Sequence, residues 1–151
     1  MSEHATRVVD NELFLPLSED DRGTLAAIAI PMTYQAGEVI FVENEEAYAL
    51  CLLLDGRVGL QMDLGNGRNI MVSTVDPGEI FAWSGLVPPH QFTATARAIE
   101  DSEVVIFKAE DLRALIEKNP AFGYTLMLRI ASLIGERLRD THLQLLGMFG
   151  A

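Results

Sequence analysis

Glycine spacing is the feature that most constrains the fold of this chain. Between residues 34 and 108, glycines interrupt the sequence repeatedly and leave short runs of β-type residues. Asn66-Gly67, which separates two of these runs, predicts a hairpin turn. Seven or eight short strands at this spacing favour a sandwich, barrel or jelly roll. The predicted strands are 39–42, 48–54, 57–63, 69–75, 79–82, 93–98 and 103–108.

Helical patterns flank the β-region on both sides. Ser18 is a good N-cap and three acidic residues follow it, which predicts a short helix over about 19–28. Residues 110–117 carry apolar side chains at helical spacing. A longer helix is predicted to begin at Asn119-Pro120, an N-cap followed by a favoured first helical residue. We expect one domain over 1–151, with a β-roll at about 33–108 and C-terminal helices at about 110–149.

The long C-terminal helix carries an apolar stripe for some six turns. At 100° per residue, one line on its surface passes close to Met127, Ile130, Ile134, Leu138 and Leu145. This stripe is longer than one small β-domain needs to cover. We therefore expect a homodimer that pairs the helix with its own copy, and the alternative is a helix folded back wholly on its own domain.

Charge and hydropathy exclude several classes of partner. The chain has 22 acidic and 11 basic residues, a net charge of −11. Such a charge repels phosphate backbones and anionic membrane surfaces. No apolar run approaches the ~20 residues of a membrane span, and the N-terminus lacks the apolar core of a signal peptide. We expect a cytoplasmic protein without direct DNA or membrane binding.

Residues that could support catalysis or metal binding are scattered. Cys51 is the one cysteine and stands in an apolar run. His4, His90 and His142 belong to three remote segments, which argues against a shared metal site. Ser84 lacks the Gly-x-Ser-x-Gly pattern of a nucleophile elbow. We expect no catalytic residues, no metal and no cofactor.

Short motifs stand at the joints between the predicted elements. They are Ala36-Gly37-Glu38-Val39-Ile40-Phe41, residues 52–58, Asp76-Pro77-Gly78-Glu79-Ile80-Phe81, residues 94–98 and Asn119-Pro120. In this order they resemble the cyclic nucleotide-binding domain of Crp/Fnr-type bacterial regulators. The resemblance covers nearly the whole chain. It implies a mainly β fold with flanking helices, a β-roll of the jelly-roll type with a long C-terminal helix, and a regulatory role without catalysis.

The resemblance also identifies a ligand site and its changes. In the family, the segment equivalent to 78–95 is the phosphate-binding cassette, where a glutamate holds the ribose and an arginine pairs with the phosphate. This sequence has Ala82 in place of the glycine, Trp83 in place of the glutamate and Phe92 in place of the arginine. Strand alternation turns Arg97 away from the side of Phe92. We expect no cyclic AMP or cyclic GMP binding at micromolar concentration.

The altered cassette leaves more than one function open. In the leading interpretation, the aromatic residues line a pocket for a flatter, less charged molecule, and the chain is a small-molecule-sensing regulatory domain. Alternatively, the rings fill the pocket and the chain is a ligand-free dimeric scaffold for a protein partner. A third reading is an effector-domain fragment of a transcription regulator. The candidate ligand-binding residues are Phe81, Ala82, Trp83, Ser84, Gly85, Leu86, Phe92, Thr93 and Ala94.

Overall fold

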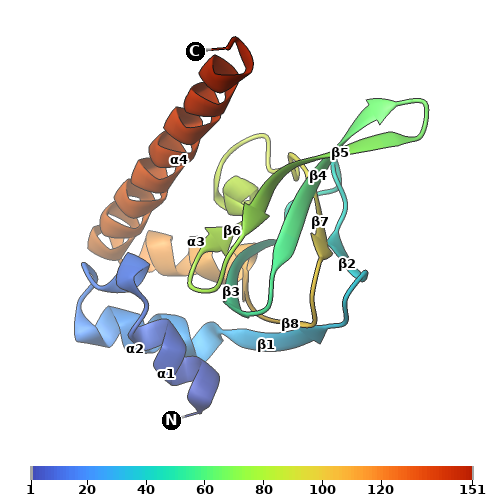
Figure 1. Ribbon diagram of the computed structural model, residues 1–151. Helices are drawn as coiled ribbons and strands as arrows, with labels where there is room; N and C mark the ends of the chain where they lie inside the picture. Colours follow the sequence, from blue (N-terminus) through green and yellow to red (C-terminus); the bar gives the residue numbers. More distant parts are fainter. Residues whose placement is uncertain (1, 151) are drawn as a thin grey trace.

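Two antiparallel four-stranded sheets face each other and form a β-roll (Figure 1). The computed structural model describes residues 2–150. The strands are β1 Ile30–Tyr34, β2 Val39–Phe41, β3 Ala49–Asp55, β4 Val58–Gly65, β5 Arg68–Val75, β6 Ile80–Phe81, β7 Thr95–Ala98 and β8 Ser102–Lys108. One sheet has the order β1-β8-β3-β6 and the other β2-β7-β4-β5. The β-roll predicted from the sequence is confirmed.

Tight turns close the roll where glycine or asparagine adopts a positive φ. Asn66 and Gly67 have φ values of 56° and 72°, and they join β4 to β5 in the predicted hairpin. Gly56 has φ of 94°, and a Cβ there would lie 2.4 Å from the carbonyl oxygen of Asp101. The β4–β5 hairpin projects beyond the roll (Figure 1), so its outer part is exposed.

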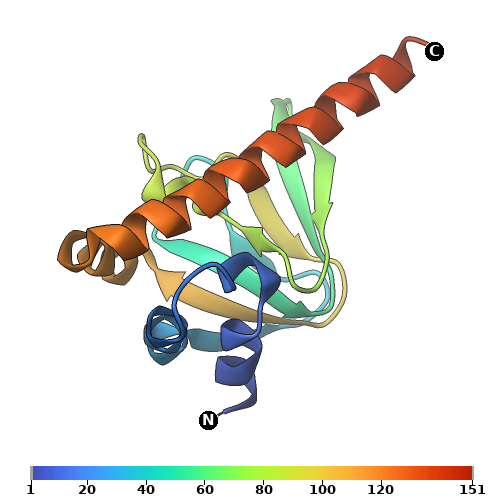
Figure 2. The same ribbon diagram turned by 90° about the vertical axis from the view of Figure 1, so that its left-hand side faces the viewer.

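Helices cover one side of the roll. They are α1 Glu3–Val9, α2 Glu19–Ile28, α3 Ala109–Lys118 and α4 Pro120–Met148, with short 3-10 helices η1 Glu12–Phe14 and η2 Trp83–Leu86. The Ser18 hydroxyl accepts a hydrogen bond from the backbone N–H of Asp21 at 3.1 Å, which confirms the predicted cap of α2. Asn119 caps α4 through the N–H of Phe122. Figure 2 shows α4 crossing the roll diagonally and extending past it.

The core has two parts, and β3 separates them. Leu50, Leu52 and Leu54 pack against the helices, whereas Cys51 and Leu53 point between the two sheets. Both faces of β3 are buried, which explains its unbroken apolar sequence. Cys51 is a free, buried thiol.

Helix α1 and strand β1 were not predicted from the sequence. Helix α1 is a two-turn helix whose Arg7 pairs with Asp55 at 2.7 Å and also donates to the Leu54 carbonyl, so contacts with the roll stabilise it. Strand β1 begins at Ile30, before the expected start of the roll at 33, and contains Pro31. It lies at the edge of its sheet, where proline is tolerated because one side of the strand needs no partner.

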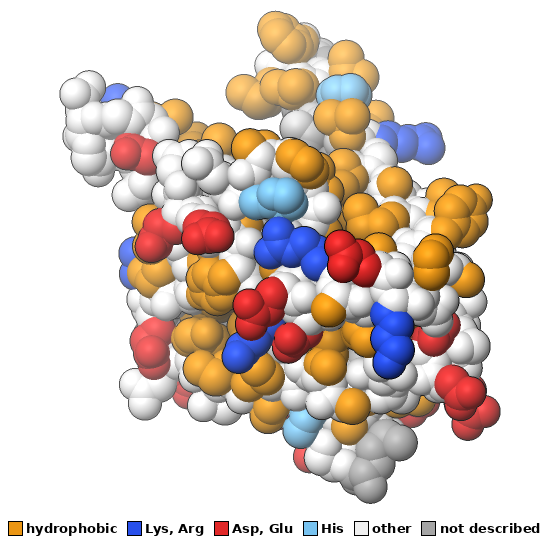
Figure 3. Space-filling model, turned by 180° about the vertical axis from the view of Figure 1, so that it is seen from behind, with side chains coloured by type: hydrophobic (Ala, Val, Ile, Leu, Met, Phe, Trp, Pro, Cys, Tyr) orange, Lys and Arg blue, Asp and Glu red, His pale blue; other side chains and the backbone are white. Residues whose placement is uncertain are grey.

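Helix α4 has an inner half and an outer half. Phe122, Leu126 and Ile130 are buried in the core between the helices and the sheet, and Met127 and Ile134 are partly buried against it. Ile130 therefore belongs to its own domain, which removes it from the expected dimer interface. Past residue 137 every described residue of α4 is exposed, including Leu138 at 54% and Leu145 at 49%. Figure 3 shows hydrophobic side chains gathered on this protruding end, at the upper right.

Candidate ligand pocket

The cassette begins with a left-handed residue between β6 and η2. Ala82 has φ of 68° and ψ of 39°, a conformation that costs little only for glycine. The backbone at position 82 thus has a conformation that glycine favours, although the residue is alanine. Gly85 lies within η2, and a Cβ there would meet the Ala109 Cβ at 3.1 Å. This close approach seats η2 against the start of α3.

Phe92 closes the cassette, and its backbone is held on both sides. Its N–H donates to the Glu45 carbonyl at 3.0 Å, and its carbonyl accepts from the N–H of Asn44 at 2.8 Å. The ring points into the roll and is only 1% exposed. It stacks on Phe41 with ring centres 3.9 Å apart, and Tyr48 meets it edge-on at 5.4 Å. The residue that the resemblance places at the family's arginine position is therefore a core side chain.

A third ring extends this stack across the roll. Phe81 lies 6.0 Å from Phe41, so the rings connect β6 of one sheet to β2 of the other. The cavity that remains beside them has a volume of only about 30 Å³, room for about one water molecule. Its lining residues are Phe41, Leu60, Ala82, Trp83, Ser84, Phe92, Thr93, Ala94 and Arg137. Packed rings, rather than an open cavity, occupy the centre of the cassette.

Trp83 turns toward the helices and meets Arg137 of α4. The guanidinium carbon lies 4.9 Å from the centre of the indole ring. The Nη2 group of Arg137 also donates to the Ile80 carbonyl at 2.6 Å. Burial lowers the pKa of Arg137, and the nearby Glu79 carboxylate acts in the opposite direction. Arginine stays charged in proteins even so. A cation from α4 therefore lies beside the cassette.

The structure brings together most of the predicted ligand residues. Ala82, Trp83, Ser84, Phe92, Thr93 and Ala94 line the remaining cavity. Phe81 packs behind Phe41, and Gly85 and Leu86 lie outside the cavity. The sequence missed Phe41, Leu60 and Arg137, which come from other elements. Arg97 donates to the Gly37 carbonyl at 2.7 Å, so it points away from Phe92, as alternation predicted.

Other chemistry is sparse in this fold. Within residues 2–150 no three His, Cys, Asp or Glu side chains form a group that could hold a metal ion. Burial raises the pKa of the Cys51 thiol. Among the described residues, no helix is long and apolar enough to cross a bilayer.

Comparison with known proteins identifies the family. The family model "Cyclic nucleotide-binding domain" matches residues 31–119, which includes the roll, the cassette and α3. The chain belongs to the cyclic nucleotide-binding domain family. The sequence resemblance is therefore confirmed, and this domain is of the Crp/Fnr-like type. Its fold is likewise that of the cyclic nucleotide-binding domains among the solved structures.

Individual relatives agree with this assignment. The cyclic AMP receptor protein of Thermus thermophilus is 32% identical over 112 residues, covering 74% of this chain and 50% of the relative. A solved Geobacter metallireducens structure, described as that of a cyclic nucleotide-binding protein, has 33% identity and a TM-score of 0.80 over 91% of this chain and 99% of that one. A lysophospholipase of Aspergillus oryzae is 29% identical over 105 residues, 70% of this chain but 7% of the relative. This cyclic nucleotide-binding domain spans half or less of these curated relatives.

Proposed function

We propose that this cyclic nucleotide-binding domain is a non-catalytic regulatory module whose ligand pocket is filled by its own aromatic side chains. The observation that carries the proposal is the stack of Phe92 on Phe41, which leaves about 30 Å³ in the cassette. The domain then acts through its surfaces on a protein partner. The proposal favours the scaffold over the ligand sensor, because the scaffold requires rings that fill the pocket, whereas the sensor requires an open pocket.

The chemistry of the cassette supports weak or absent cyclic nucleotide binding. A buried phosphate needs charge-assisted hydrogen bonds, each worth about 1.5–3 kcal/mol. Phe92 and Trp83 supply none in place of the family's arginine and glutamate. The loss is on the order of 3–6 kcal/mol, or roughly 100-fold or more in affinity relative to family members that retain both groups.

Calorimetry on a matched pair of proteins tests this proposal. The wild type should give no binding heat with cyclic AMP or cyclic GMP at micromolar concentration. The variant Phe92→Arg/Trp83→Glu restores both charges and opens the stack, so cyclic nucleotide should raise its thermal midpoint by mass action. Phe92→Leu/Trp83→Leu is the control that opens space without charge, and it should not respond. A low-micromolar dissociation constant for the wild type, abolished by a bulky substitution at Ser84 or Thr93, would overturn the proposal.

A second candidate keeps a small-molecule ligand in this site. Arg137, Ser84 and Thr93 line the remaining cavity and offer a cation and two hydroxyl groups. They favour a small, flat molecule, less charged than a cyclic nucleotide, which would enter only if Phe92 moved. Thermal-shift screening against small aromatic acids tests this candidate. A saturable rise in the midpoint that Phe92→Trp removes would favour it over the filled pocket.

The regulatory module is proposed to be a homodimer through α4. Its outer half leaves Leu138, Leu145 and Leu146 49–60% exposed, and an uncovered apolar surface of this extent is unusual for a monomer. Leu138→Glu should produce monomers in sedimentation analysis. Arg139→Glu, one residue further on, is the matched control and should stay dimeric. A wild type that sediments as a monomer at micromolar concentration would contradict the homodimer.

A further inference from the structure

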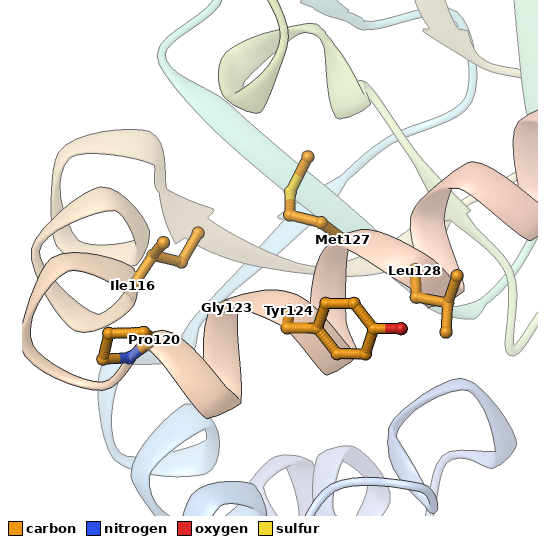
Figure 4. Close-up of a pocket in the computed structure, with 6 residues that line it drawn as sticks. All are labelled: Ile116, Pro120, Gly123, Tyr124, Met127 and Leu128. Atoms are coloured by element: carbon orange, nitrogen blue, oxygen red, sulfur yellow. The ribbon is translucent and has the colours of Figure 1, made fainter.

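A groove of about 410 Å³ lies outside the roll, where α3 meets α4 (Figure 4). Its lining is apolar and consists of Ile116, Pro120, Gly123, Tyr124, Met127 and Leu128. Figure 4 shows Gly123 on α4 between Ile116 of α3 on one side and Tyr124 on the other. A Cβ on Gly123 would lie 2.6 Å from Cγ2 of Ile116. Ile116 of α3 therefore lies directly over the bare backbone of Gly123, and the two helices pack closely beside the groove.

The α4 residues of the groove have a specific spacing. Pro120, Gly123, Tyr124 and Met127 stand at i, i+3, i+4 and i+7. Four residues at this spacing form the hole that receives a side chain from the facing helix of a coiled coil. With Tyr124 at position a of a heptad, Pro120 and Met127 occupy position d and Gly123 occupies position g. In a parallel pair, the side chain that enters this hole comes from position a at the same level of the other helix, which is Tyr124.

Tyr124 has the properties of that side chain. It is 71% exposed and therefore contributes little to its own domain. A two-fold interface requires that one patch carry both the protruding group and its receptor, since each copy presents the same surface. The Tyr124 ring and the groove beside it meet this requirement on a single stretch of α4.

The same heptad continues along α4, with its a positions exposed and two of its d positions, Met127 and Ile134, partly buried against their own domain. Position a is taken by Tyr124, Ala131, Leu138 and Leu145, and position d by Met127, Ile134, Thr141 and Met148. None of these side chains is charged, so a second copy can approach without desolvating an ion. The apolar side chains on this line are exposed at both ends of the helix, Tyr124 at 71% and Met148 at 81%, and Leu138 and Leu145 lie between them at 54% and 49%.

We propose that the groove between α3 and α4 receives Tyr124 of a second copy, and that this reciprocal insertion fixes the register of the dimer. The inference rests on the homodimer proposed above and adds α3 to its interface. Ile116 then meets the second copy although it lies outside the paired helix. An interface confined to the outer half of α4 would not involve Ile116 or Tyr124.

Dimer dissociation constants measured by sedimentation test this geometry. Tyr124→Ala should raise the constant by at least ~100-fold, because each dimer loses two inserted rings. Tyr124→Phe retains the ring and should stay within roughly threefold of the wild type. Ile116→Lys places an ammonium group in the apolar groove and should weaken the dimer by a similar ~100-fold. Ala114→Lys, at an exposed position on the same helix, is the matched control and should have no effect.

The outcomes separate this inference from the homodimer itself. If the wild type is a dimer and both Tyr124→Ala and Ile116→Lys associate as tightly as it does, the groove is not part of the interface and only this inference fails. A monomeric wild type removes the homodimer and this inference together. Circular dichroism establishes that each variant is folded. Should Ile116→Lys unfold, Tyr124→Ala decides alone, since an exposed ring can be removed without loss of the core.

Discussion

Arg137 and Trp83 form the contact that joins α4 to the cassette, with the guanidinium carbon 4.9 Å from the centre of the indole ring. The two residues are 54 positions apart (137 − 83) and belong to a long helix and a 3-10 helix of four residues. The same guanidinium donates to the carbonyl of Ile80, so one side chain contacts both the first residue of β6 and the first residue of η2. Trp83 is the only tryptophan of the chain, which makes this contact visible by fluorescence.

Arg137→Ala should destabilise the domain by about 2 kcal/mol, because a charge-assisted hydrogen bond and a cation–π contact are both lost. The emission of Trp83 should shift to longer wavelength as water reaches the indole. Urea unfolding followed by fluorescence measures both effects. Arg139→Ala, at an exposed position two residues later, should change neither. Unchanged emission from folded Arg137→Ala would show that the contact does not shield the ring.

Ala82→Gly should stabilise the domain by about 0.5–1 kcal/mol, even though glycine usually destabilises. Relief of the left-handed conformation is worth roughly 1–2 kcal/mol, and the extra freedom of glycine in the unfolded chain offsets part of it. Ala27→Gly, on the exposed side of α2, is the control and should destabilise by about 1 kcal/mol. Urea midpoints that fall for both variants would contradict a strained Ala82.

Two glycines in helices should respond oppositely to the same substitution. Gly123→Ala should cost about 1–3 kcal/mol, because the added Cβ would lie 2.6 Å from Ile116. Gly23→Ala in α2 should gain about 0.5–1 kcal/mol, since nothing lies within 4 Å of the added atom. Chemical denaturation at one protein concentration compares them. A gain at both positions would mean that α3 and α4 are less tightly packed than described.

Cys51 should make the domain less stable in alkali. Burial raises its pKa in the folded state, so the folded chain holds the thiol proton more tightly than the unfolded chain does. Its contribution is fully present below the unfolded value of about 8.5 and is lost above it, by roughly 1.4 kcal/mol per pH unit. Unfolding free energies at pH 8 and pH 10 should fall more for the wild type than for Cys51→Val. Equal losses would exclude the thiol as a cause.

The strands could be predicted because their signals are local. Asn66-Gly67 specifies its hairpin by the φ values that these residues tolerate, and Ser18 and Asn119 mark helix starts through their own side chains. Helix α1 also has a side-chain cap, since the Ser2 hydroxyl accepts a hydrogen bond from the N–H of Ala5 at 3.2 Å, but its seven residues are too few for a helical period to stand out. Strand β1 has no comparable signal. The helix depends on the pairing of Arg7 with Asp55 across the fold, and the strand on the edge position that tolerates Pro31.

The candidate site could be predicted only in part for a similar reason. Trp83 and Phe92 were found because each occupies a position where the family pattern has a charged residue. Phe41 and Arg137 come from distant elements, and nothing in their local sequence shows that they meet the cassette. Periodicity also placed Ile130 on one stripe with Leu138, whereas the roll covers the first and ends before the second.

The way Phe92 is held has a kinetic consequence. Its ring lies against Phe41 and Tyr48, and both its N–H and its carbonyl are hydrogen bonded to the segment around Glu45. A molecule can enter between the sheets only after these contacts have opened together. Its association rate would then level off at the rate of opening, however much of the molecule is added. The opening of the Phe92 contacts, and not the frequency of collisions with the ligand, would then set how fast the site is filled.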